Sequence, residues 1–392
     1  MTPHSHPSSH APAQSRRWFL QLAASAGGIL AAPHLALAAA PTERRFVFII
    51  QRGAADGLNT VIPYADPAYA GLRGALAIDP AAATRLDGTF ALHPSLVEIA
   101  KLYVTQQALF VHAVASPYRD RSHFDGQNVL ESGGSSPHDI KDGWMNRLVT
   151  LLPRSGGEAI AISPTVPFAL RGRAEVHTYA PSSPRQTPDD LLQRVQSLYA
   201  QDAQLHALWS AAMEARNMAA GTTLRQNPAE LGQLAARFLA QPAGPRIAML
   251  ETNGWDTHSA QANRLSTQLR SLDAMVAALR DGLGLAWAQT TVLVATEFGR
   301  TAAANGTGGT DHGTASAAML LGGAVKGGRV IADWPGLATS ALYQGRDLKP
   351  TTNLDALIAT AAGECFGIEP ARVSRALFPQ QVAGRELPRL LI

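Results

Sequence analysis

Cysteine is nearly absent from this sequence, since Cys365 is the only one among 392 residues. A chain with one cysteine has no intrachain disulfide, even in an oxidising compartment. An excess of charge of one sign is also lacking, since the formal net charge is only +3. It falls to +1 without Arg16 and Arg17, the only Lys, Arg, Asp or Glu residues before residue 41. This balance gives no electrostatic basis for binding nucleic acid or acidic membranes. With 46% hydrophobic residues, the chain is expected to be globular with an ample core.

Long apolar runs are lacking too, apart from the segment that follows the twin arginines. The stretch SRRWFLQLAASAGGILAAPHLALAAA combines those arginines, an apolar run and the small-residue pattern Ala36-Leu37-Ala38. It is typical of a Tat signal peptide over residues 1–40, cleaved during export by the Tat translocase. The run is short for a spanning helix, which needs about 20 residues, so no transmembrane anchor is expected after cleavage. Residues 41–392 are predicted to form one periplasmic or secreted domain.

Apolar stretches separated by helical patterns predict the architecture of that domain. From Leu265 to Leu283, apolar residues recur at spacings of three and four, as on one face of a long helix. Strands that alternate with helices predict an α/β fold with a largely parallel central sheet and helices on both faces. Residues 184–242, with a helix start at Thr187-Pro188, are predicted to be a helical insertion. The expected strands are residues 46–50, 108–114, 158–163, 246–254, 290–299 and 317–321.

Polar side chains gather where these strands end. In open α/β sheets, ligands bind beyond the carboxyl ends of the strands. Each residue also has an ordinary structural explanation, such as a turn, a helix cap or a surface ion pair, but five such loops at one edge favour a ligand site. His, Asp and Glu are ligands for zinc or manganese, and two such ions can clamp a displacement at phosphorus. The residues concerned are Asp56, Arg119, Arg121, Ser122, His123, Asp125, Asp256, His258, Glu297, Arg300, Asp311 and His312.

Ser122 stands out among them as a candidate nucleophile. Its hydroxyl lies in sequence between Arg121 and His123, with Arg119 close by. Arginines neutralise the oxygens of an anionic ester, and a metal lowers the pKa of a hydroxyl. This grouping is suited to attack on such an ester.

Five motifs together resemble an uncharacterised family of Tat-exported bacterial proteins. The family is grouped with the alkaline phosphatase-like superfamily, which also holds sulfatases and cofactor-independent phosphoglycerate mutases. The resemblance runs from about Phe46 to about Phe366 and implies an alkaline phosphatase-like fold. The motifs are ADGLNTVIPYADPAY, SHFDGQ, GWDTH, TEFGRT and GTDHGTASAAMLLGGAVKGG.

The resemblance also implies site residues. Ser122 matches the nucleophile, Arg121 and Arg300 are candidate anion clamps, and Asp256, His258 and His312 match the first metal site. A second metal would take Asp56 and Glu297, with Asp311 or His123 in place of the histidine that Phe298 replaces. Asp125 is a further candidate. Asp256 and His258 are two residues apart where the superfamily pattern has four, so we expect them in a loop or a strained helix start.

These residues predict a metal-dependent hydrolase of phosphate or related small anionic esters, with one or two zinc or manganese ions. A different class remains open: a secreted binding protein that keeps the fold with one metal or none and has no turnover. A formylglycine sulfatase is disfavoured, because Ser122 is followed by HFDG and Cys365 lies in GECFGIEP, neither of which has the required Pro and Arg.

Overall fold

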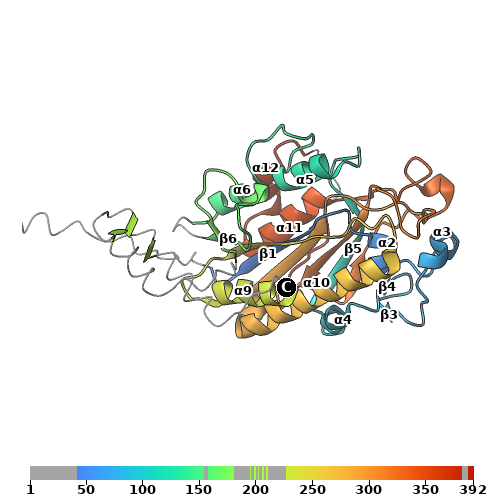
Figure 1. Cartoon of the computed structure of the whole chain (residues 1–392), viewed down its shortest axis with the longest axis horizontal. Coiled ribbons are helices and arrows are strands. Elements are labelled where there is room, and N and C mark those ends of the chain that lie inside the picture. Colours follow the sequence, from blue (N-terminus) through green and yellow to red (C-terminus); the bar gives the residue numbers. More distant parts are fainter. Residues whose placement is uncertain are drawn as a thin grey trace, which may run out of the picture.

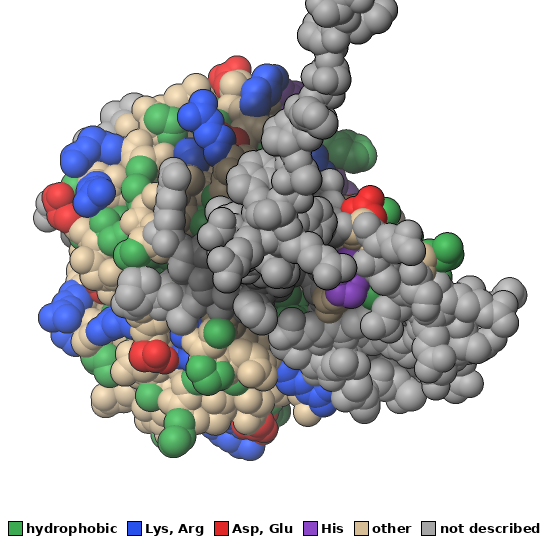
Figure 2. All heavy atoms as spheres, turned by 90° about the vertical axis from the view of Figure 1, so that its left-hand side faces the viewer, with side chains coloured by type: hydrophobic (Ala, Val, Ile, Leu, Met, Phe, Trp, Pro, Cys, Tyr) green, Lys and Arg blue, Asp and Glu red, His purple; other side chains and the backbone are tan. Residues whose placement is uncertain are grey.

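The computed structural model describes residues 42–153, 158–180, 227–381 and 387–392, together with single positions between 195 and 210. The predicted signal peptide and the helix start at Thr187-Pro188 lie outside these residues. No helix in the described part is long and apolar enough to cross a bilayer. On the face shown in Figure 2, acidic and basic side chains are interspersed over the described surface, in keeping with the small net charge.

A nine-stranded sheet forms the centre of the molecule (Figure 1). Its strands follow the order β11-β5-β10-β9-β1-β8-β6-β7, and β12 also pairs with β5. All pairings are parallel except those of β10, which is antiparallel to β5 and β9. The six predicted strands are all present. The strands are β1 (Arg45–Gln51), β5 (Ala108–Ala115), β6 (Ala159–Ala161), β7 (His177–Thr178), β8 (Ile247–Thr252), β9 (Thr290–Thr296), β10 (Ser316–Leu321), β11 (Arg329–Ile331) and β12 (Thr352–Asn353).

Both faces of the sheet are buried, and β1 shows why. Val47 and Ile49 belong to one hydrophobic cluster, while Phe46, Phe48 and Ile50 belong to another, because successive side chains point to opposite faces. One face is covered by α4 (Val97–Val104), α9 (Pro228–Ala240) and α10 (Gln261–Leu283). The other is covered by α6 (Trp144–Leu151), α11 (Leu354–Phe366) and α12 (Pro370–Leu377) (Figure 1). The prediction of a mostly parallel sheet between two helical layers is confirmed.

Helix α10 is the long helix expected from the leucine spacing, and its apolar residues from Leu265 to Leu283 are buried. It begins at Gln261 and its N-cap residue is Ala260, so Asp256 does not cap it. Asp256 and His258 therefore lie in the loop between β8 and α10. Within the predicted insertion, α9 packs along α10 and has Asn227 as its N-cap.

The antiparallel strand β10 has a direct consequence for the position of the site. Ser316, its first residue, pairs with Val114 near the end of β5. The loop that precedes β10 therefore lies at the same sheet edge as the loops that follow β1, β5, β8 and β9. This edge also carries α2 (Gly57–Thr60) after β1 and α5 (His123–Ser132) after β5.

The remaining elements lie away from this edge or along its rim. Cys365 is buried in α11, where burial raises the pKa of its thiol to about 12, so it is a poor nucleophile. A small antiparallel sheet is formed by β2 (Val61–Ile62), β4 (Ala91–Leu92) and β3 (Thr84–Arg85). The other short elements are α3 (Tyr69–Arg73), η1 (Gly74–Leu76), η2 (Phe168–Leu170), η3 (Gly284–Gln289) and η4 (Thr339–Ala341).

Candidate metal centre

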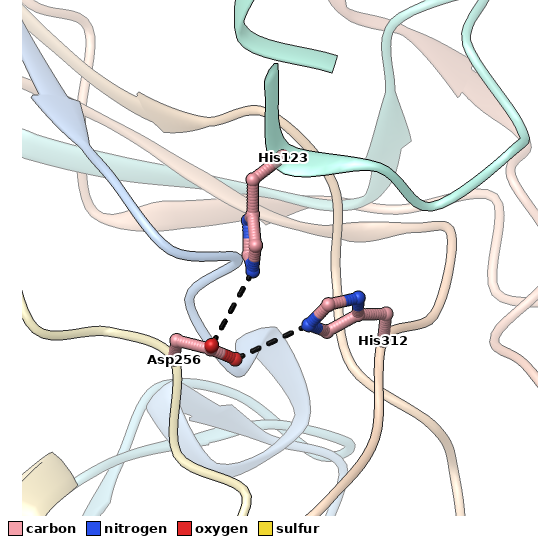
Figure 3. Close-up of side chains that lie close together, drawn as sticks. All are labelled: His123, Asp256 and His312. Atoms are coloured by element: carbon pink, nitrogen blue, oxygen red, sulfur yellow. Dashed lines mark hydrogen bonds and ion pairs between the residues drawn. The ribbon is translucent and has the colours of Figure 1, made fainter. Parts of the chain in front are cut away.

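Three side chains from distant parts of the chain converge at this edge (Figure 3). His123 begins α5, Asp256 follows β8, and His312 precedes β10. The Oδ2 atom of Asp256 lies 3.5 Å from His123 Nε2, and its Oδ1 atom lies 3.2 Å from His312 Nε2. One ligand atom from each residue lies within 4.8 Å of the other two, and no other group of this kind occurs in the described residues.

His258 brings a fourth candidate ligand to the same place. Its Nε2 atom lies 3.0 Å from Asp256 Oδ1 and 2.9 Å from His312 Nε2. The two imidazole rings have their centroids 4.7 Å apart. The loop position expected for Asp256 and His258 thus lets both reach one centre although they are only two residues apart.

Each of the three histidines has its Nδ1 atom held by an acceptor. His123 Nδ1 lies 2.9 Å from Glu297 Oε1, and His258 Nδ1 lies 3.1 Å from Asp311 Oδ1. His312 Nδ1 lies 2.9 Å from the carbonyl oxygen of Arg121, which accepts but never donates. The carbonyl partner assigns a proton to Nδ1 of His312, and the carboxylate partners favour the same tautomer in His123 and His258, which directs all three Nε2 atoms toward Asp256.

This arrangement calls for a cation among the Nε2 atoms. The Nε2 atoms of His258 and His312 lie 2.9 Å apart, and two ring nitrogens at this distance need a proton or a metal ion between them. His123 Nε2 is buried and has no hydrogen-bond partner among the described residues. Buried polar atoms without partners are uncommon and call for an explanation.

The spacing and chemistry of the donors fit one divalent ion. Ligands about 2.0–2.1 Å from zinc in a tetrahedron lie roughly 3.3 Å from one another. The three Nε2 atoms lie 3.0–3.5 Å from an oxygen of Asp256, and those of His258 and His312 lie 2.9 Å apart. The donors that all lie within 4.8 Å of one another are those of His123, Asp256 and His312. Three imidazole nitrogens with a carboxylate suit zinc, and Nδ1–H groups held by carboxylates or carbonyls are the usual support for such ligands.

The charges around the centre favour neutral imidazole beside an ionised carboxylate at His312 and Asp256. Burial lowers the pKa of His312, and the charge of His123 lowers it further. Burial raises the pKa of Asp256, but the hydrogen bond and charge of Arg300 outweigh it and leave the pKa below its usual value. The hydrogen bond to Glu297 raises the pKa of His123, so without a metal this ring holds a proton more readily.

Buried polar groups fix the two ligand loops against each other. Arg300 is fully buried, and its Nη1 donates to Asp256 Oδ1 at 2.6 Å while its Nη2 donates to the Thr310 carbonyl. Gln261 Oε1 accepts from the hydroxyls of Thr257 and Thr310, at 2.9 Å and 2.6 Å. One buried amide thus ties the loop of Asp256 and His258 to the loop of His312.

Two glycines allow the loops to approach this closely. A Cβ atom on Gly309 would lie 2.3 Å from the backbone carbonyl of His258, which no real contact allows. Gly53, with φ +116, would place a Cβ atom 2.7 Å from the backbone nitrogen of Asp256. The glycine before the Asp311-His312 pair therefore serves close packing between loops.

The three carboxylates predicted for a second metal each contact another group. Asp56 forms a buried ion pair with Arg73 at 2.6 Å, accepts from Gln261 and caps α2. Glu297 is fully buried and supports His123, while Asp311 supports His258. The structure does not bring these three together as one ligand group, and their role as direct ligands stays a prediction.

Phe298 occupies the position where the superfamily pattern implies a histidine. Its ring stacks on His123 with centroids 5.1 Å apart and an interplanar angle of 23°. It also lies 5.4 Å from the His312 ring. Phe298 thus packs against two candidate ligands and restricts their orientation.

The other predicted residues lie around the centre. Ser122 is the N-cap residue of α5, directly before His123, and its side chain caps no backbone N–H. The guanidinium of Arg121 is turned to Asp347, 2.7 Å away, and this residue reaches the centre only through its carbonyl. Arg119 bonds nearby carbonyls, and Asp125 lies 3.6 Å from His138.

Sequence reasoning missed the supporting residues Gln261, Thr310 and Arg73. Gln261 is the first residue of α10, and no motif in the sequence singles it out. Thr310 lies next to the Asp311-His312 pair, which is the one local signal for it. Arg73 lies 17 residues from Asp56 and has no sequence pattern that links the two.

A mixed α/β fold with a mostly parallel sheet and a histidine-rich centre at its carboxyl edge defines a candidate metalloprotein. The chain belongs to DUF1501, a family described as "Protein of unknown function", whose profile matches residues 43–378. The family resemblance inferred from the five motifs is therefore confirmed. A comparison with curated proteins finds no match.

Several solved structures are similar in outline. Ps i-CgsB in complex with k-i-k-neocarrahexaose is 11% identical with a TM-score of 0.41, over 84% of this chain and 73% of that one. The zinc complex of the C-terminal periplasmic domain of EcEptC from Escherichia coli is 10% identical with a TM-score of 0.35, over 72% and 74%. Phosphonate monoester hydrolase of Agrobacterium radiobacter is 11% identical with a TM-score of 0.32, over 84% of each chain.

Proposed function

We propose that this protein is an exported, metal-dependent hydrolase of phosphate or related anionic esters. The observation that carries the proposal is the convergence of three histidine Nε2 atoms on Asp256, with every Nδ1 beside an acceptor. The ligands are His123, His258, His312 and Asp256, and zinc is the ion that best suits this donor set.

A bound divalent ion would supply a Lewis acid that polarises an ester oxygen. The protein's own groups prepare the site for that chemistry. Glu297 and the Arg121 carbonyl hold the rings of His123 and His312 with Nε2 toward the centre, and Arg300 keeps Asp256 ionised and oriented. Because Glu297 and Arg300 are buried, these two supports are fixed before any substrate arrives.

The centre is open to solvent on one side. The side chains of Asp256 and His258 are 41% and 44% exposed, while those of Glu297 and Arg300 are fully buried. An ester can thus approach Asp256 and His258 from solvent, while Glu297 and Arg300, which support the ligands, stay shielded from water. We keep Ser122, one residue before His123, as the candidate nucleophile that the sequence predicts.

Export through the Tat translocase is part of the proposal and rests on residues 1–40. Arg16, Arg17, the apolar run and Ala36-Leu37-Ala38 support it. The expected location is the periplasm or the medium. Replacing both arginines with lysine should retain the precursor in the cytoplasm, detected by fractionation and immunoblotting; unchanged export would contradict this part.

The test of the function combines metal analysis with an ester panel. Purified mature protein is loaded with zinc or manganese and assayed on 4-nitrophenyl phosphate, bis(4-nitrophenyl) phosphate, 4-nitrophenyl sulfate and 4-nitrophenyl phenylphosphonate. We expect turnover of at least one ester that is abolished in His312→Ala and kept in His177→Ala, a histidine of the edge strand β7. Ser122→Ala should lose turnover and keep the metal; full activity there would exclude Ser122 as nucleophile.

The second candidate function is a secreted binding protein without turnover. The engagement of Asp56 by Arg73 favours it, because a group predicted to bind a second metal is already neutralised. In that case His312→Ala lowers thermal stability through loss of the metal, and no member of the ester panel is turned over.

A further inference from the structure

A cleft of about 400 Å³ lies on the outer side of α5. It is lined by residues of helix α5, of the loop 138–141 and of η2 with the following Arg171. Its lining is mostly apolar but differs from that of a core cavity, since it has a basic side and one exposed ring. The residues used below are Phe124, Gln127, Asn128, His138, Lys141 and Arg171.

The cleft is preformed, because both of its other lining segments are hydrogen-bonded to α5. The backbone N–H of His138 donates to Asn128 Oδ1 at 2.7 Å. On the other side, the backbone N–H of Ala169 donates to Glu131 Oε2 at 3.0 Å, and Arg52 pairs with Glu131 Oε1 at 2.8 Å. A site with fixed walls loses little conformational entropy when a ligand binds.

The charges that face the cleft favour an anion. Lys141 Nζ donates to the carbonyl of His138, and Arg171 Nε donates to the carbonyl of Val166. Both cations are exposed, and no carboxylate among the described residues pairs with either of them. Glu131, the one acidic residue of the lining, pairs with Arg52, which also pairs with Glu251, and the lining holds two cations against this one carboxylate. The cleft therefore has a net positive lining.

The exposed ring of Phe124 adds an apolar face. Its side chain is 88% exposed, which is unusual for phenylalanine on a folded domain. Large exposed aromatic residues beside polar groups are typical of binding sites, where they stack on a flat part of the ligand. The basic lining and the exposed Phe124 ring together favour a ligand that contains a ring and a negative charge.

Helix α5 connects this cleft to the metal centre. Gln127, one turn after His123, lines the cleft and donates to Glu297 Oε1 at 3.2 Å, the atom that also holds His123 Nδ1. Phe124 directly follows His123 in the chain. A molecule in the cleft therefore lies beside the centre, with the Gln127 side chain between them.

We propose that this cleft binds the non-reacting part of the substrate, a ring with a negative charge of its own. The ring lies against Phe124 and the anion lies at Lys141 and Arg171. The inference rests on the proposed function, because it assigns the reacting ester to the metal centre. It names the substrate class as esters whose alcohol portion is cyclic and anionic.

The test is a fluorescence titration of the zinc-loaded mature protein with naphthalene-1-sulfonate, a ring with one anion and no ester. We expect saturable binding whose Kd rises about tenfold in Lys141→Ala/Arg171→Ala, since hydrogen bonds to charged groups are lost. Phe124→Ala, a change at an exposed side chain that leaves folding intact, should raise Kd about threefold. The matched control Lys326→Ala/Arg372→Ala, at two exposed positions, should bind as the wild type does.

Three results would overturn the proposal: no saturable binding, a Kd unchanged in both cleft variants, or equal affinity for uncharged 1-naphthalenemethanol. Binding that is lost in His312→Ala and kept in the cleft variants would also overturn it, because the anion would then be at the metal centre. Cleft binding without turnover of any ester contradicts the hydrolase function alone and leaves the anionic-ring site in place.

Discussion

The difference between His112 in the core and the three histidines of the metal centre shows what distinguishes a core histidine from a candidate ligand. His112 lies within β5 and is fully buried. Its Nε2 is 2.8 Å from the carbonyl of Val61, its Nδ1 accepts from the N–H of Ala113, and its ring stacks on Phe90. Both of its ring nitrogens have partners within the protein.

The histidines of the metal centre differ at one atom. His123, His258 and His312 have partners at Nδ1, and each directs Nε2 to Asp256. They lie in loops or at the first residue of a helix, and none of their Nε2 atoms is hydrogen-bonded to a backbone carbonyl of the described residues. Residue type alone therefore does not mark a ligand; what distinguishes these histidines is that their Nε2 atoms converge on one carboxylate, and that of His123 has no hydrogen-bond partner among the described residues.

Removal of a candidate ligand should have the largest effect on zinc affinity. His312→Ala should weaken zinc binding by more than about a hundredfold, because even supporting residues contribute ten- to hundredfold to metal affinity. The measurement is a competition titration with a chromophoric zinc chelator. His177→Ala is the control and should bind zinc like the wild type; equal weakening in both would contradict a specific centre.

Titration or replacement of His112 should change the free energy of unfolding and leave metal binding unchanged. Burial lowers its pKa to about 4 from 6.5, so the folded state binds fewer protons than the unfolded state between these values. Stability from this group is therefore complete above about pH 6.5 and falls as the pH drops toward 4, by about 3 kcal/mol.

The check is urea denaturation of the wild type and of His112→Gln from pH 7 to pH 4.5. The glutamine amide can still donate to the Val61 carbonyl but does not titrate in this range. We expect a smaller loss of stability with falling pH in the variant. Identical pH profiles would show that His112 is not the source of the effect.

Glu297 should have an intermediate effect. Glu297→Gln keeps the shape of a fully buried side chain and removes the charge that holds the His123 ring. We expect zinc affinity to fall about ten- to hundredfold. The same chelator titration measures it, and a wild-type Kd in a folded variant would show that Glu297 does not support the ligand.

Asp311 should have the smallest effect, because its contact with His258 is exposed. The Asp311 side chain is 51% exposed, and exposed ion pairs contribute at most about 1 kcal/mol. Asp311→Asn should weaken zinc binding by less than about fivefold. A loss as large as that of Glu297→Gln would indicate that Asp311 is itself a ligand.

The fold could be predicted from the sequence because its signals are local. Runs such as RFVFIIQ at β1 and the leucine spacing of α10 each determine one element, and their alternation determines the sheet. The antiparallel direction of β10 has no such signal, since it depends on pairing with β5 and β9.

The edge of the sheet that carries the site could also be predicted. Which residues there are candidate ligands and which support the ligands could not. His123 was only a secondary candidate from sequence, because its role depends on Glu297 lying beneath it. Asp56 read as a ligand because Arg73, which pairs with it, comes from a separate helix. Such roles depend on contacts between loops that sequence spacing does not specify.

Metal content tests the central claim most directly. The exported mature protein is purified without chelator or added metal, dialysed, and analysed for zinc, manganese and other transition metals, with His312→Ala alongside. The account predicts one tightly bound divalent ion per folded chain in the wild type and its loss in the variant. A folded wild-type protein that holds no metal, and binds none when titrated with zinc or manganese, would contradict it.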